Sequence, residues 1–233
     1  DAHVMILDLA NLSSVKKFVE EYKSRFDRLD LLINNAGVMM PPYSKTTDGF
    51  ELQFGTNHLG HFALTLQLLD VTEKTENSRI VNVSSVAHNY GNLDFKDLTW
   101  EKRSYNKMKS YGDSKIANIY FTYELQDKLN EKGSNVKVVA AHPGWTATEL
   151  QRHAGLFDFL NNFFAMKIEQ GALPTLRAAV DPDALGKDYY GPDGWREMRG
   201  FPVRVKSNDL SNDKAIAKQL WDVSEELTGV KFN

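Results

Sequence analysis

Residues 29–37 read LDLLINNAG, an apolar run that ends in small and polar residues. Three other segments have the same form: residues 3–9 (HVMILDL), 79–84 (RIVNVS) and 136–141 (VKVVAA). Short runs that are apolar on both faces are typical of parallel strands covered by helices. We therefore predict four parallel strands here, and a short last strand at Tyr189 and Tyr190.

Segments of helical length separate these runs. After the first run, apolar residues from Val15 to Phe26 recur at helical spacing, and Asn11 or Ser13 is placed to cap that helix. The pattern predicts further helices at about residues 52–72, 110–131, 170–180 and 212–227. Strands that alternate with helices indicate an α/β fold, and we expect one domain over residues 1–233.

The composition excludes several kinds of protein. A net charge of −3 over 233 residues gives no electrostatic reason to expect a nucleic-acid partner. The absence of cysteine rules out disulfides, zinc–thiolate sites and a thiol nucleophile. No apolar run reaches the roughly 18 residues of a membrane span, and no signal peptide is recognised. A cytoplasmic location is compatible with this composition.

Small and polar residues follow each predicted strand. They are Asp8, Asn35 to Gly37, Ser84 with Ser85, and Pro143 with Gly144. Ligands of parallel α/β sheets bind at the carboxyl ends of the strands. We therefore expect a binding site where these residues meet.

Tyr111 and Lys115 are the strongest candidates for chemistry. They lie four residues apart on a predicted helix and so share a face. A free tyrosine has a pKa of about 10, and a nearby cation lowers it towards neutrality. Tyr105 and Lys109 have the same spacing but stand in a polar stretch, KRSYNKMK, so we favour the second pair.

The chain resembles the short-chain dehydrogenase/reductase family. The motifs that carry the resemblance are Asp8-Leu9, NNAG at 34–37, Asn57 within NHLGHF, RIVNVSS ending at Ser85, Tyr111-xxx-Lys115, and Pro143-Gly144 leading to Thr148. They occur in the order of the family and span nearly the whole chain. NHLGHF, YGDSKIAN, HPGWTATEL and GPDGWREMRG are most similar to the retinol-dehydrogenase-like branch.

The resemblance implies a Rossmann-type doubly wound parallel sheet and an NAD(P)-dependent enzyme that interconverts an alcohol and a carbonyl compound. Tyr111 would be the general acid/base, Lys115 would lower its pKa and bind the nicotinamide ribose, Ser85 would hold the substrate oxygen, and Asn57 would anchor a relay water. The cofactor would contact Asp8, Leu9, Asn35, Ala36, Gly37, Tyr111, Lys115, Pro143, Gly144, Thr146 and Thr148. NADP is favoured over NAD, as in this branch.

The resemblance also implies that residues 149–200 cover the substrate. The part rich in Leu and Phe, from Leu156 to Met166, would suit a lipophilic substrate, although an amphipathic helix that only packs on the core explains it equally well. The two long helices are a candidate homodimer interface, as in many relatives.

The glycine-rich phosphate loop of the family is missing, because only seven residues precede Asp8. In the strand order 3-2-1-4-5-6, residues 3–9 are strand 3 and residues 29–34 are strand 4, so strands 1 and 2 are absent from this chain. The gap between strands 3 and 4 would be about 14 Å, and the two should not pair. We expect a natural N-terminal segment before residue 1, in which a membrane anchor has room.

Two other functions are alternatives to an active dehydrogenase/reductase. One is a non-catalytic dinucleotide-binding or interaction protein on the same fold. The other is the related light-dependent protochlorophyllide reductase, which uses cysteines that this chain lacks. A metal site at His58 and His61 is disfavoured, because their spacing is not that of HExxH, and His142 is expected to pack rather than to react.

Overall fold

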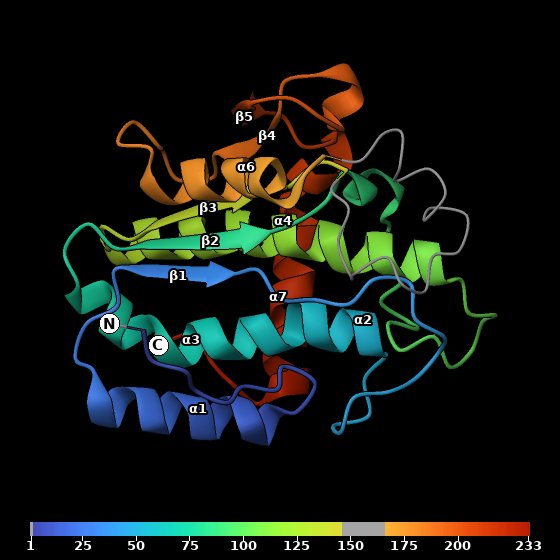
Figure 1. The fold of residues 1–233 in the computed structure, drawn as a ribbon. Helices are drawn as coiled ribbons and strands as arrows, with labels where there is room; N and C mark the ends of the chain where they lie inside the picture. Colours follow the sequence, from blue (N-terminus) through green and yellow to red (C-terminus); the bar gives the residue numbers. More distant parts are fainter. Residues whose placement is uncertain (1, 146–165) are drawn as a thin grey trace.

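The centre of the fold is a mainly parallel sheet, seen in a computed structural model that describes residues 2–145 and 166–233 (Figure 1). Among these residues the strand order is β1-β2-β3-β4-β5. The strands are β1 (Leu31–Asn34), β2 (Arg79–Val83), β3 (Lys137–Ala141), β4 (Tyr189–Pro192) and β5 (Pro202–Val205). The first four are parallel and β5 is antiparallel to β4, so the carboxyl ends of β1 to β3 meet at one edge.

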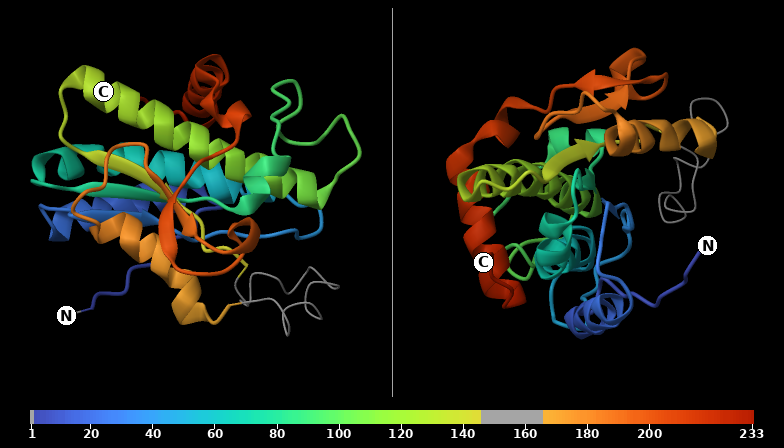
Figure 2. Two further views of the ribbon diagram at one scale, coloured as in Figure 1. Left: turned by 90° about the horizontal axis from the view of Figure 1, so that it is seen from above. Right: turned by 90° about the vertical axis from the view of Figure 1, so that its left-hand side faces the viewer.

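One face of the sheet is covered by α3 (Gly60–Lys74) and α4 (Lys107–Lys132), with α7 (Lys214–Thr228) packed behind them. Ile80 and Val138 of the sheet meet Phe62, Phe121 and Trp221 of these helices in one buried cluster. The short α2 (Leu52–Phe54) precedes α3. Helices α4 and α7 lie on the same side of the sheet in the right-hand view of Figure 2.

The opposite face is covered by α6 (Ile168–Val180), which packs on Val81 and Val139 through Ala178 and Ala179 (Figure 2). Alternate residues of β2 and β3 therefore face different helices, which is why these runs are apolar throughout. Helix α1 (Leu12–Arg25) packs on α3, and the Asn11 side chain caps it by accepting from two backbone N–H groups.

The predicted strand at residues 3–9 is wrong. The segment has no strand structure, and Val4 and Ile6 are 94% and 87% exposed. A strand has no hydrogen bonds within itself, so an apolar run forms one only beside a partner. The described residues offer it none: β1 pairs with β2 alone, and its Leu31 and Ile33 are exposed. The expectation that residues 3–9 do not pair with β1 is confirmed.

Two further elements differ from prediction. The helix expected at 52–72 is interrupted by a π-helical turn, Gly55–Leu59, in which the Gly60 N–H reaches the Gly55 carbonyl. The short strand β5 was not predicted, because it begins at Pro202 and only its pairing with β4 defines it. Among the described helices, none combines the length and apolar character needed to cross a membrane.

A buried arginine joins the sheet to α6. Arg79, which begins β2, donates to the carbonyls of Ala178 (2.7 Å) and Asp181 (2.9 Å) at the end of α6. We expect Arg79→Met to lower the free energy of unfolding by about 2 kcal/mol in urea titration, since both charge-assisted bonds are lost. The exposed Arg28, which pairs with Asp30 on the surface, provides the control. Equal losses in Arg79→Met and Arg28→Met would contradict this role.

Candidate active site

A cavity of about 620 Å³ opens at the carboxyl ends of β1, β2 and β3. Residues 35–39 after β1 form one wall, and residues 83–85 at the end of β2 also line the cavity. Pro143 and Gly144 follow β3 on the far side, and Tyr111 and Lys115 enter from α4. The structure thus gathers most of the predicted site residues around one space of the size of a ligand pocket.

Helix α6 contributes a largely apolar surface to the lining of the cavity. Its residues at the cavity are Ile168, Gly171, Ala172, Thr175 and Leu176. Ile168 and Leu176 are 63% and 51% exposed, although both are large and apolar. Exposed apolar side chains that converge on a cavity are suited to contact an apolar ligand.

Tyr111 and Lys115 are buried next to each other on α4, with Lys115 Nζ 5.6 Å from the centre of the Tyr111 ring. Burial lowers the pKa of Lys115 to about 8. Burial also raises the pKa of Tyr111 to about 12, against the smaller opposing effect of a hydrogen bond with the Ser85 side chain.

The pKa of Tyr111 differs from the expectation that Lys115 would lower it. The ammonium group lies over the ring and donates to the Val83 carbonyl at 3.1 Å. The lost hydration of the phenolate is the larger effect in this structure, so the Tyr111 hydroxyl is protonated at pH 7.

The two serines after β2 have different surroundings. Ser84 is fully buried, and its hydroxyl donates to the Lys115 carbonyl at 2.8 Å. Ser85 is half-buried, lines the cavity and interacts with Tyr111. It also caps the short 3₁₀ helix Val86–Tyr90 by accepting from Ala87 N–H. The geometry therefore favours Ser85, as the sequence did, and its capping role coexists with its place at the cavity.

Asn57 lies behind the cavity wall, in the π-helical turn. Its Oδ1 accepts from Val38 N–H (2.8 Å), and its Nδ2 donates to the Val38 carbonyl (2.9 Å) and to Ser114 Oγ (3.0 Å). Both polar atoms of the side chain thus have protein partners, and Asn57 does not line the cavity itself. A Cβ at residue 37 would lie 2.7 Å from Asn57 Oδ1, so glycine is required there.

The histidines near the site have structural partners. His61 Nδ1 contacts the Asn57 carbonyl at 3.0 Å, and His58 Nε2 contacts Ser224 Oγ at 2.8 Å. Burial lowers their pKa values to about 4 and about 3, so both rings are neutral. His142 is buried and contacts Glu197 at 2.9 Å. Within the described residues, no group of three or more metal-ligating side chains forms a site.

The second Tyr–Lys pair is structural. The Tyr105 hydroxyl donates to Glu51 Oε1 at 2.9 Å and accepts from Gln53 Nε2 at 2.8 Å. Lys109 forms an ion pair with Asp113. Neither residue lines the cavity. Identical spacing therefore leads to different surroundings, as the polar stretch around Tyr105 indicated.

Two predicted cofactor residues are not at the cavity. Asp8 and Leu9 do not line it; the Asp8 carboxylate accepts from Ala10 N–H within its own turn, and Leu9 is buried against α3. Thr146 and Thr148 lie outside the described residues, as does the segment 149–165. No sequence pattern pointed to Ser114, whose hydroxyl is bonded to Asn57.

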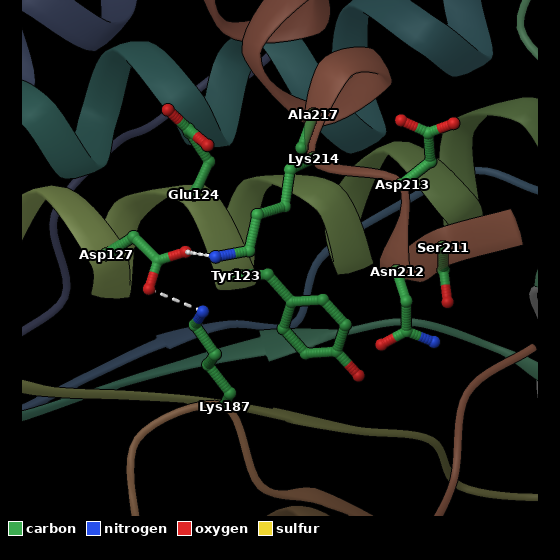
Figure 3. A pocket seen from close by; sticks show the side chains of 9 residues that line it. All are labelled: Tyr123, Glu124, Asp127, Lys187, Ser211, Asn212, Asp213, Lys214 and Ala217. Atoms are coloured by element: carbon green, nitrogen blue, oxygen red, sulfur yellow. Dashed lines mark ion pairs between the residues drawn. The ribbon is translucent and has the colours of Figure 1, made fainter. Parts of the chain in front are cut away.

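A second, smaller cavity of about 220 Å³ lies between α4 and α7 (Figure 3). Asp127 at its rim pairs with Lys187 (2.5 Å) and Lys214 (3.8 Å), and these are the dashed contacts in Figure 3. The charges of Asp127, Lys187 and Lys214 at this rim thus satisfy one another.

The chain is similar to known proteins along its whole length. A family model described as short chain dehydrogenase matches residues 1–156. Retinol dehydrogenase 14 of Mus musculus is 43% identical over 233 residues, which cover 96% of this chain and 66% of the relative. Retinol dehydrogenase 13 of Homo sapiens is 41% identical, with 97% and 68% covered. The chain thus spans about two thirds of the length of these relatives.

Solved structures agree with this assignment. The crystal structure of an uncharacterised protein from Mycobacterium paratuberculosis is 40% identical, with a TM-score of 0.83, and the match covers 99% of this chain and 77% of that one. The Pseudomonas aeruginosa RhlG/NADP complex, 22% identical with a TM-score of 0.57 and 78% and 72% covered, shares the fold. This chain belongs to the short-chain dehydrogenase family, in its retinol-dehydrogenase-like branch.

Proposed function

We propose that this chain carries the proton-transfer part of the active site of a nicotinamide-dependent oxidoreductase that interconverts an alcohol and a carbonyl compound. The observation that supports it most is the buried pair of Tyr111 and Lys115 at the cavity. Among the described residues, no carboxylate forms an ion pair with Lys115. A protein that only binds a dinucleotide gains nothing from burying this cation beside a proton donor.

In the direction of reduction, Tyr111 donates its proton to the carbonyl oxygen, since its pKa of about 12 keeps it protonated at pH 7. Ser85 provides a second hydroxyl for the same oxygen and orients the Tyr111 phenol through their hydrogen bond. A nicotinamide dinucleotide held at the cavity would supply the hydride for the carbonyl carbon, and oxidation of an alcohol would reverse both transfers. Such proton donation typically contributes about a hundredfold to ten-thousandfold to the rate.

The residues around the cavity fit such a cofactor. Gly37 and Gly144 bring backbone close to the space; Gly144 has a φ of +68°, and a Cβ there would lie 2.6 Å from the Met198 carbonyl. Asn35, Ala36, Gly37, Pro143 and Gly144 would hold the nicotinamide end, and Lys115 would bind its ribose. We assign Asp8 and Leu9 to the adenine end and favour NADP over NAD.

We further propose a lipophilic aldehyde or ketone as the substrate. The exposed apolar residues Ile168 and Leu176 of α6 support this choice, because they face the same cavity as Tyr111. They belong to the region 149–200 that we expect to cover the substrate. The names of the relatives suggest a retinoid, which is one member of this class.

The test is a screen of the full-length protein for oxidation of NADPH and NADH with aldehydes and ketones of increasing chain length, with Tyr111→Phe as the control. We expect turnover that improves with apolar length and disappears in the variant. Cofactor binding without turnover of any carbonyl compound would instead support the binding-only alternative.

The buried lysine predicts a pH dependence. The value of kcat/KM for the cofactor follows ionisations of the free enzyme, and we expect it to fall as the pH rises through about 8, where Lys115 loses its charge. Lys115→Arg stays charged over this range, so the fall near pH 8 should vanish in that variant. A fall that persists unchanged in Lys115→Arg would assign it to another group.

A further inference from the structure

We infer that Ser114 is a positioning residue that holds the two walls of the cofactor cavity together. Its hydroxyl connects Asn57, which grips the loop at Val38, to the turn of α4 that carries Tyr111. This inference rests on the proposed function, since it assigns Ser114 a part in cofactor binding. Ser114 does not line the cavity, so it acts only through its partners.

The direction of each hydrogen bond is determined by its partners. Ser114 Oγ lies 2.8 Å from the Tyr111 carbonyl, which can only accept, so the hydroxyl donates there. The serine oxygen is then free to accept from Asn57 Nδ2 at 3.0 Å. Ser114 is completely buried, so water cannot replace either bond.

The other end of the link is equally well determined. Val38 offers both backbone groups to Asn57: its N–H donates to Oδ1 (2.8 Å), and its carbonyl accepts from Nδ2 (2.9 Å). These two bonds fix which side of the amide is oxygen. The remaining Asn57 N–H must then point to Ser114, which is the only hydroxyl bonded to it in the described residues.

The link joins two of the segments that line the cavity. Residues 35–39 form one wall and α4 another, and Ser114 with Asn57 spans the space behind them. Loss of the Ser114 hydroxyl leaves the amide of Asn57 with an unpaired donor and loosens the loop. The Tyr111 hydroxyl would be unaffected, because Ser85 contacts it from the cavity side. Cofactor affinity should therefore suffer more than turnover.

Ser110 provides a matched control. It stands one turn before Ser114 on α4 and is also completely buried, but its hydroxyl lies beside Tyr105 rather than Asn57. Ser110→Ala and Ser114→Ala therefore remove the same atom from the same helix at the same depth. Any loss of stability or activity that follows from deleting a buried hydroxyl of α4 in general should appear in both variants.

The kinetic test measures KM for the cofactor and kcat in the full-length protein. We expect Ser114→Ala to raise this KM about five- to tenfold, the effect of one buried hydrogen bond, with kcat within about twofold. Ser110→Ala should leave both constants unchanged. Ser114→Cys, which fills the site with a somewhat larger group that donates weakly, should resemble Ser114→Ala, and it serves the same test if the alanine variant is unstable.

A second measurement needs neither cofactor nor turnover. Hydrogen–deuterium exchange should show faster exchange of the Val38 amide in Ser114→Ala than in wild type, and no change in Ser110→Ala, because this N–H is bonded to Asn57 Oδ1. Equal exchange and equal KM in the two alanine variants would overturn the inference. If wild type shows no turnover while exchange at Val38 still responds to Ser114, the proposed function has failed and the link has not.

Discussion

Tyr111→Phe is expected to lower kcat about a thousandfold, the contribution of a well-placed general acid. Phenylalanine keeps the ring that packs beside Met40 and Ala87, so the fold should be retained and only the proton donor is lost. Ser85 would keep its place at the cavity and could still bind the substrate oxygen. The measurement is kcat at saturating cofactor and substrate, with circular dichroism to verify the fold.

The second tyrosine of the duplicated spacing is the control for this prediction. Tyr105→Phe removes a hydroxyl that bonds Glu51 and Gln53, away from the cavity. We expect Tyr105→Phe to lower the free energy of unfolding, because Glu51 and Gln53 lose a hydrogen-bond partner. It should leave kcat within about twofold of wild type, because Tyr105 does not line the cavity. Comparable losses of kcat in Tyr105→Phe and Tyr111→Phe, or full activity in the latter, would refute Tyr111 as the proton donor.

Lys115→Met is expected to reduce kcat/KM for the cofactor about a hundredfold or more while making the protein more stable. The activity falls because the only cation at the cavity wall among the described residues is lost. Stability rises because a charge that is 4% exposed no longer has to be buried. The pKa shift from 10.5 to about 8 corresponds to a cost of about 3 kcal/mol for burying the charged lysine. Loss of the hydrogen bond to the Val83 carbonyl offsets about 1 kcal/mol of the gain in stability.

The pH dependence of this gain has a definite sign. A lysine whose pKa is lower in the folded state binds its proton less well there, so it destabilises the fold fully below pH 8. The penalty fades as the pH rises from about 8 to 10.5, where the unfolded chain also loses the proton. In urea unfolding, the gain in the free energy of unfolding of Lys115→Met should therefore be smaller at pH 10 than at pH 7.

Lys109→Met is the matched control for Lys115. Lys109 pairs with Asp113 and donates to the Asn92 carbonyl at 2.8 Å. Its removal leaves the largely buried Asp113 with a weaker set of partners, so stability should fall while activity is kept. A gain in stability for Lys109→Met, or a loss for Lys115→Met, would contradict the conclusion that the buried charge of Lys115 destabilises the fold.

Local sequence was sufficient to predict the strands and helices whose apolar pattern lies entirely within their own residues. The runs at 29–34, 79–84 and 136–141 correspond to β1, β2 and β3, and the periodic segments correspond to α1, α4, α6 and α7. The N-cap at Asn11 could also be read locally, because a cap bonds backbone groups two and three residues away. The order of the motifs identified the family and pointed to Tyr111 over Tyr105.

Other features depend on partners far along the chain. Residues 3–9 have a strand-like pattern but no strand, and β5 exists through β4 alone. The raised pKa of Tyr111 follows from its burial, whereas spacing suggested a lowered one. The partners of Ser114 and Asn57 come from three separate segments, so no pattern near Ser114 could reveal its bonds.

The sequence by itself thus determined the parallel α/β architecture, the family and most of the residues that meet at the strand ends, because periodicity and motif order are properties of neighbouring residues. Only the tertiary structure decided which strands find partners and how burial shifts the pKa values of Tyr111 and Lys115. Hydrogen bonding between strands and loss of hydration both require groups from distant segments to come together, which is information that no local stretch contains.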